Sequence, residues 1–180
     1  MRNIYKITFK NLIAWLLILP IVFLLYGCPY SSAYKIDQEP SIPVEDIFIG
    51  KWATIAPNGT AIKMIIDKKN DYEYNINFTG NLNELKQFNI AKNDTLKTTA
   101  FVSEAATRRF LNIRLFSQYY IAEFIYKNDK ITLLPLCEHF TSRLIKSDAE
   151  IKSSLEQHYQ TRLYPLYDDE FCLRDMKRVE

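Results

Sequence analysis

Short segments in which apolar and polar residues alternate, separated by turn residues, run from Ile47 to Cys137. The clearest is Tyr72–Phe78, where every second residue is aromatic or aliphatic and the residues between are Glu or Asn. A period of two places the apolar side chains on one face of a strand. Asn58-Gly59 and Asn128-Asp129 are pairs that tolerate the positive φ of tight hairpin turns. The pattern therefore predicts an antiparallel meander.

We expect about eight strands in this region, most of them joined by hairpins. Regular spacing of short strands is typical of a meander that curls into a barrel or a sandwich. The expected strands are Ile49–Ala56, Ala61–Lys68, Tyr72–Phe78, Leu85–Ile90, Leu96–Ser103, Arg108–Leu115, Tyr119–Tyr126 and Ile131–Cys137.

One helix is predicted after the strands. Ser147 followed by Glu150 fits a capping box, and apolar residues then recur at every fourth position from Ile151 to Leu163. Residues 171–176 predict a last strand that returns to the sheet. The expected fold class is mainly β: an antiparallel meander curling into an eight- to nine-stranded barrel or sandwich, with one C-terminal helix that covers an open barrel end.

The first 27 residues have the character of a signal peptide. Residues 1–11 contain three basic residues and no acidic ones, and an apolar run of 15 residues, Leu12–Tyr26, follows them. As a helix that run would reach roughly 22 Å, which is short of the roughly 30 Å core of a bilayer. The short run and the positive start are typical of a secretory leader. An uncleaved signal anchor is the alternative.

Leu25-Tyr26-Gly27-Cys28 closes the apolar run and resembles a bacterial lipobox. The resemblance implies that the Cys28 thiol receives a diacylglycerol and that cleavage between Gly27 and Cys28 makes Cys28 the new N-terminus. It also implies a bacterial cell-envelope location, for which we expect the outer membrane, facing the periplasm.

Residues 28–46 contain three prolines among polar residues, which predicts a flexible tether that buries little. The expected organisation is a signal peptide at 1–27, a tether at 28–46 and a β-barrel-like domain at 47–180 that folds without the tether.

The charge of the chain argues against a nucleic-acid partner. The formal net charge is +2, and the leader carries three of the 23 basic residues and none of the 21 acidic ones. The remainder is close to neutral and has no basic excess with which to bind a phosphate backbone.

Gly50-Lys51-Trp52 at the start of the first expected strand resembles the Gly-x-Trp of lipocalins and related calycin barrels. The resemblance implies that Gly50 and Trp52 form a plug at the closed end of a barrel, with a basic side chain over the Trp ring. Arg174 is the candidate for that basic residue.

The chain also resembles a group of small bacterial lipoproteins. The shared pattern is Cys-Pro-Tyr-x-Ser at 28–32, Ile-Gly-Lys-Trp at 49–52, Ser-Asp-Ala-Glu-Ile at 147–151 and Tyr-Asp-Asp-Glu-Phe at 167–171. This second resemblance implies a lipid anchor and carries no activity.

The sequence assigns no catalytic residue, cofactor or metal ligand. It contains two histidines, His139 and His158, and no second cluster of Cys and His to complete a zinc site. It also lacks a Gly-x-Ser-x-Gly elbow and a glycine-rich phosphate loop. Cys137 and Cys172 either form a disulfide, as the oxidising envelope permits, or are two buried thiols.

These observations favour a non-enzymatic binding or structural role at the membrane, which is contacted through the acyl chains. The partner is either another envelope protein or a small apolar ligand carried by a lipocalin-like barrel; an envelope hydrolase is a third class. Six aromatic residues could fill the barrel or line such a ligand cavity: Tyr72, Tyr74, Phe78, Phe110, Phe124 and Tyr126.

Overall fold

The computed structural model describes residues 29–57, 59–80, 95–162 and 165–180. The expected strand Leu85–Ile90 and the lipobox lie outside them. The described elements are β1 (Ser31–Ser32), η1 (Asp46–Phe48), β2 (Gly50–Ile55), β3 (Ala61–Lys68), β4 (Tyr74–Gly80), β5 (Thr95–Ala105), β6 (Arg108–Leu115), β7 (Gln118–Lys127), β8 (Lys130–Pro135), α3 (Asp148–Thr161) and β9 (Leu173–Val179).

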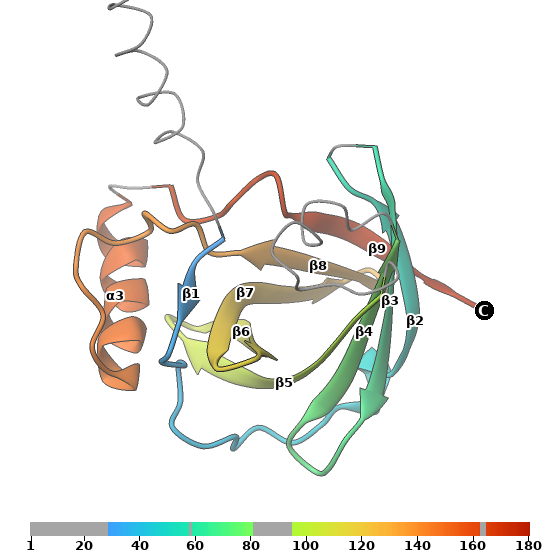
Figure 1. The fold of residues 1–180 in the computed structure, drawn as a ribbon, viewed down its shortest axis with the longest axis horizontal. Coiled ribbons are helices and arrows are strands. Elements are labelled where there is room, and N and C mark those ends of the chain that lie inside the picture. Colours follow the sequence, from blue (N-terminus) through green and yellow to red (C-terminus); the bar gives the residue numbers. More distant parts are fainter. Residues whose placement is uncertain (1–28, 58, 81–94, 163–164) are drawn as a thin grey trace, which may run out of the picture.

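The nine strands form one antiparallel sheet in the order β1-β7-β6-β5-β4-β3-β2-β9-β8. A further pairing between β7 and β8 closes strands β2 to β9 into an eight-stranded barrel, and β1 is an extra strand against β7 (Figure 1). The predicted antiparallel barrel, its C-terminal helix and its returning last strand are confirmed.

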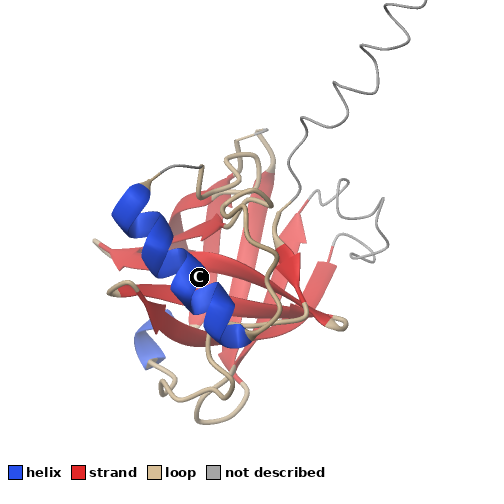
Figure 2. Ribbon diagram, turned by 90° about the vertical axis from the view of Figure 1, so that its left-hand side faces the viewer, coloured by secondary structure: helices blue, strands red, loops and turns tan. Residues whose placement is uncertain are grey.

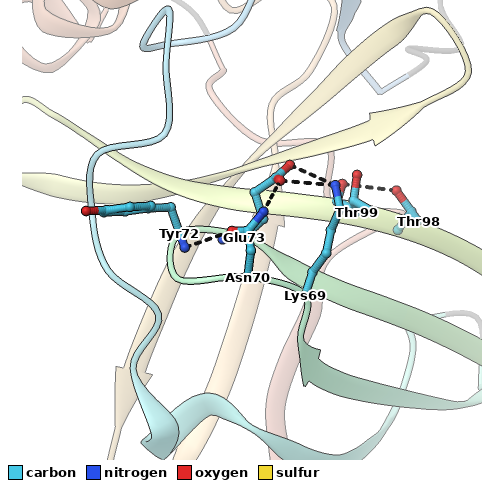
Figure 3. A network of polar contacts seen from close by, with 6 residues as sticks. All are labelled: Lys69, Asn70, Tyr72, Glu73, Thr98 and Thr99. Carbon is cyan, nitrogen blue, oxygen red and sulfur yellow. Dashed lines mark hydrogen bonds and ion pairs between the residues drawn. The ribbon is translucent and has the colours of Figure 1, made fainter.

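The turn between β3 and β4 is longer than the alternation predicts, and this moves Tyr72 out of the strand. The Asn70 side-chain oxygen accepts hydrogen bonds from the backbone N–H groups of Tyr72 and Glu73, at 2.9 and 2.8 Å. Glu73 in turn binds Lys69 and the Asn70 amide (Figure 3). An Asx turn of this kind replaces strand geometry, so β4 begins at Tyr74 and Tyr72 is exposed.

The hairpin turns use residues with positive φ. Asn128 and Asp129 have φ of 53° and 56°, as their side chains predict for a two-residue hairpin. Phe116, in the turn between β6 and β7, has φ of 56° and is 74% exposed. A bulky residue pays a steric cost in that region.

Phe116→Gly is therefore expected to raise the free energy of unfolding by about 0.5–1 kcal/mol. Removing the left-handed strain is worth roughly 1–2 kcal/mol, and the extra freedom of glycine in the unfolded chain offsets about 0.5–1 kcal/mol of it. Urea unfolding measures the difference. Ser117→Gly, at the neighbouring position without positive φ, should lower stability instead; an equal gain in both variants would contradict the strain argument.

One hydrophobic cluster fills the barrel. It draws on the inward residues of all eight barrel strands together with Phe48 of η1. Its fully buried members include Trp52, Met64, Ile76, Ile131 and Met176, all 0% exposed. Because these side chains have no surface that water can reach, the interior around them is filled by side chains.

A second cluster lies outside the barrel, under α3. Ala105, Phe110 and Ile121, on the outer faces of β5 to β7, pack with Ile151 and Leu155 of the helix. The helix therefore covers one side of the barrel (Figures 1 and 2). The prediction that it covers an open end of the barrel is wrong. Its start is as predicted, because the Ser147 side chain accepts a hydrogen bond from the Glu150 N–H.

Residues 29–46 are part of this folded unit, so the predicted tether at 28–46 is wrong for the described residues. The chain pairs with β7 through β1, and Ile36 is 2% exposed in the outer cluster. Further along, Ile42 and Val44 pack against the interior cluster. Pro40 and Pro43 lie between these contacts, so the folded domain includes residues 29–46 and does not begin at residue 47.

Candidate binding site at the closed end of the barrel

Trp52 plugs one end of the barrel together with η1. Its indole N–H donates to the carbonyl oxygen of Phe48 at 2.9 Å, and its ring is fully buried. Phe48 packs edge-on against Phe124, with ring centroids 4.7 Å apart. The polar atom of the indole is thus satisfied while the ring fills the core.

The basic residue over the Trp ring is Arg178 and not Arg174. Trp52 and Arg178 are direct partners in the β2–β9 ladder, so both side chains lie on the same face. The Arg178 guanidinium lies 4.6 Å from the Trp52 ring centroid and donates to the carbonyls of Ile47 and Ile49. Arg174 instead pairs with Asp169.

Gly50 makes room for this guanidinium. A Cβ added at Gly50 would lie 2.7 Å from Nη1 of Arg178, and Gly50 has φ of 144°. Glycine at the first position of Gly50-Lys51-Trp52 is therefore required by both the backbone and the arginine.

Gly50→Ala is expected to lower the free energy of unfolding by about 1–3 kcal/mol, through backbone strain and displacement of Arg178. Gly59→Ala is the matched control, since Gly59 also has positive φ but nothing lies within 4 Å of the added carbon. Thermal or urea unfolding compares the two. The contact part of the loss should disappear in an Arg178→Ala background; an unchanged loss there would contradict the contact.

The six aromatic residues named as possible cavity lining do not form one group. Tyr74, Phe78 and Phe124 are buried in the interior cluster, and Tyr126 is half-buried against it. Phe110 lies in the outer cluster under α3, and Tyr72 is 45% exposed in the β3–β4 turn. Of these four, Tyr74, Phe124 and Tyr126 pack with their rings against the Phe48 ring.

A pocket of about 420 Å³ lies beside the plug, where β6 and β7 diverge. Phe48, Phe124 and Tyr126 provide apolar surface, and Glu45, Arg108, Arg109 and Glu123 provide charge. This volume falls within the range of ordinary ligand pockets, roughly 300–1,000 Å³.

The backbone of β7 is open to this pocket. The β6–β7 ladder ends at the Phe110–Glu123 pair, although β7 continues to Lys127. Lys127 and Lys130 flank a two-residue hairpin, so Phe124 and Tyr126 turn their N–H and C=O groups away from β8. On that side the Phe110–Glu123 pair is followed by one bond, from the Phe124 N–H to the Arg109 carbonyl, and the described residues supply no strand partner for Tyr126.

The charged residues at the pocket are held in place by ion pairs. Arg109 binds Glu45 at 2.7 Å and Arg108 binds Glu123 at 2.6 Å. The Glu123 carboxylate is 3% exposed and also accepts from the hydroxyls of Tyr159 and Tyr167. Burial raises the pKa of Tyr159, which keeps its hydroxyl protonated as a donor.

This network joins the barrel wall to α3 and to the segment that follows it. Tyr159 and Tyr167 come from those two elements, and the Arg108 guanidinium lies 4.6 Å from the Tyr159 ring centroid. A buried carboxylate costs stability unless it is paired and hydrogen-bonded, and Glu123 is both. The network therefore makes one rim of the pocket rigid.

Cys137 and Cys172 are both buried and free. Burial raises the pKa of Cys137 and raises that of Cys172 to about 11. Both thiols therefore stay protonated at neutral pH and are poor nucleophiles.

Within the described ranges, no three His, Cys, Asp or Glu side chains gather closely enough to hold a metal ion. Of the two histidines, His139 is exposed in the segment after β8, and His158 is buried on α3. No helix in the described part of the chain has the length and apolarity needed to cross a membrane.

The comparisons with known proteins do not assign the chain to a family. No protein-family model, curated protein or solved structure matches the chain. The closed eight-stranded antiparallel barrel is compatible with the lipocalin-like fold that Gly50-Lys51-Trp52 suggested.

Sequence reasoning missed the pocket at the β6–β7 divergence, because it depends on where a ladder ends. Glu123 carried one usable signal: it is an acidic residue inside the apolar segment 119–126, at a position that the structure buries.

Proposed function

We propose that this chain is a lipid-anchored protein of the bacterial cell envelope, on the outer membrane facing the periplasm, with a non-enzymatic role in binding a partner protein. The chain would act as a membrane-held docking module. The pocket at the β6–β7 divergence is the proposed contact site.

The position of Pro29 is the observation that carries the anchoring part. Pro29 forms a bridge with Cys137, and the Tyr30 N–H donates to the Leu136 carbonyl at 2.8 Å. Pro29, the first residue that the structure describes, is thus already part of the folded domain. Acyl chains on Cys28 would hold the barrel directly against the membrane surface, and several chains together give stable anchoring.

The open backbone of β7 supports a protein as the partner. An extended peptide could pair with the C=O group of Phe124 and the backbone of Tyr126, which lie beyond the last pair of the β6–β7 ladder, as in strand addition. The adjoining apolar and charged side chains would then select its sequence. A carrier of a small apolar ligand has less support, because the interior around Trp52 is filled by side chains.

Cys28→Ser tests the anchor. The variant is expected to lose labelled fatty acid and to keep its leader, so it should run larger on a gel. Cys137→Ser is the control, since Cys137 is a buried cysteine within the domain; it should be labelled and processed normally. Labelling and processing of the Cys28→Ser chain at the normal level would contradict lipidation at this residue.

A photo-crosslinking amino acid at Thr107 tests the docking site in cells. Thr107 is exposed and lines the pocket, whereas Lys63 is exposed on the outer face of β3. We expect a discrete protein adduct from Thr107 and none from Lys63. Equal adducts from both positions, or none from Thr107, would argue against docking at the pocket.

A further inference from the structure

A second, smaller cavity lies between the C-terminal half of α3 and the segment that follows β8. Its volume is about 110 Å³, and its polar lining comes from Thr141, Ser142, Arg143, Ser154, Gln157, His158 and Thr161. It shares no lining residue with the pocket described above, so the two are separate.

Two buried polar atoms in this cavity have no partner. Ser154 is 3% exposed and His158 is 9% exposed, and neither Oγ of Ser154 nor Nδ1 of His158 has a hydrogen bond to a described residue. They lie one helical turn apart on the same face of α3. Buried polar groups in folded proteins nearly always have a partner, so both atoms point to an occupant.

The charge state of the His158 ring limits what Nδ1 can pair with. Burial lowers the pKa of His158, so the ring is neutral at neutral pH. A neutral imidazole has one N–H donor and one bare nitrogen that accepts. A bare Nδ1 would need an occupant that donates a hydrogen bond.

The charge of the cavity favours an anion. Among the described residues, Arg143 is the one charged residue that lines the cavity, no carboxylate lines it, and Arg143 has no ion pair. The positive charge of Arg162 also acts on His158. The C-terminal end of a helix carries roughly half a negative charge, which two guanidinium groups outweigh.

We propose that this cavity binds a phosphate group that retains a hydroxyl, as in hydrogen phosphate or a phosphate monoester. Its P–OH would donate to Nδ1 of His158, and its charged oxygens would accept from Ser154 Oγ and the Arg143 guanidinium. A carboxylate supplies no such donor. The volume of the cavity is also larger than the volume of one water molecule in the liquid, roughly 30 Å³.

The phosphate could be a free ion or the headgroup of a lipid. Phe140 lines the cavity, and its ring packs against the Tyr30 ring with centroids 4.9 Å apart. Tyr30 lies two residues after Cys28 in the sequence. Leu144, beside Arg143, is 78% exposed. Only the lipid source rests on the proposed anchor; binding of free phosphate does not.

The first experiment titrates inorganic phosphate into the full chain in a non-ionic detergent and follows the imidazole NMR signals. His158 should shift saturably, while the exposed His139 stays unchanged. Sulfate, which has no hydroxyl at neutral pH, should bind at least about tenfold more weakly. Arg143→Gln should weaken phosphate binding by at least about tenfold, and Arg114→Gln, an exposed arginine on β6, should not.

The proposal is overturned if His158 shows no saturable shift, if both histidines shift alike, or if sulfate binds as well as phosphate. The first of these results would mean that water alone occupies the cavity. Ser154→Ala should weaken binding with the far-UV spectrum unchanged, which separates a lost contact from a lost fold.

The second experiment uses phosphate-free buffer and lipid nanodiscs. A His158 shift in phosphatidic acid, a monoester, but not in phosphatidylglycerol, a diester, would assign the site to a lipid headgroup. A shift with inorganic phosphate alone would assign it to a free ion and equally supports the proposal. A failed nanodisc arm with a successful phosphate arm would contradict only the lipid source.

Discussion

Replacing Trp52 with alanine is expected to lower the free energy of unfolding by about 3–5 kcal/mol, the loss typical of a large aromatic truncated in a core. The ring is fully buried, and three groups depend on it: the Phe48 carbonyl, the Tyr126 ring and the Arg178 guanidinium. Its removal would leave a cavity between η1 and the barrel strands.

Urea unfolding compares this variant with Lys51→Ala, the exposed neighbour in the same strand, which should change stability by less than about 0.5 kcal/mol. Trp52 is the one tryptophan after residue 28, so its fluorescence in the processed chain can be read alone. Efficient quenching by iodide, or a loss below about 1 kcal/mol, would contradict a buried plug.

Deleting residues 29–46 is expected to prevent stable folding of the barrel. The segment supplies β1, the buried Ile36 and the apolar contacts of Ile42 and Val44. It also ties α3 to the barrel, because the Lys35 N–H donates to Asp148 and Asp37 binds Lys152. Domain stabilities are only about 5–15 kcal/mol, so losing these contacts together is enough to unfold the domain.

The test compares chains 29–180 and 47–180 by circular dichroism and thermal unfolding. The longer chain should be β-rich and unfold cooperatively, and the shorter one should not. As point variants, Ile36→Ala should cost about 2–5 kcal/mol and the exposed Glu39→Ala should cost little. Equal stability of the two chains would restore the original boundary at residue 47.

The barrel could be predicted because its signal is local. Alternation of side chains and turn residues such as Asn128-Asp129 follow from strand geometry and backbone sterics within a few residues. The same rule failed at Tyr72, because the Asn70 side chain offered the backbone a competing turn. It also misplaced Phe110, because both faces of β6 are buried. The barrel core covers the inner face, and α3 covers the outer face, where Phe110 lies.

The candidate sites depend on contacts between distant segments, which the sequence does not display. Arg178 reaches Trp52 only because β9 runs on to Val179, beyond the expected end at residue 176. The pocket depends on the early end of the β6–β7 ladder. The prolines of the N-terminal segment predicted a tether, because the sequence does not show that an edge of β7 is available to pair with this segment.

The most direct test of the account is the mass and N-terminus of the protein purified from bacterial membranes. Intact-mass and peptide mass spectrometry should find a chain that begins at Cys28 and carries a thioether-linked diacylglycerol, followed directly by the peptide from Pro29. A chain that retains residues 1–27 without lipid, or that begins elsewhere with an unmodified residue, would contradict the proposal that a lipid on Cys28 holds the barrel against the membrane.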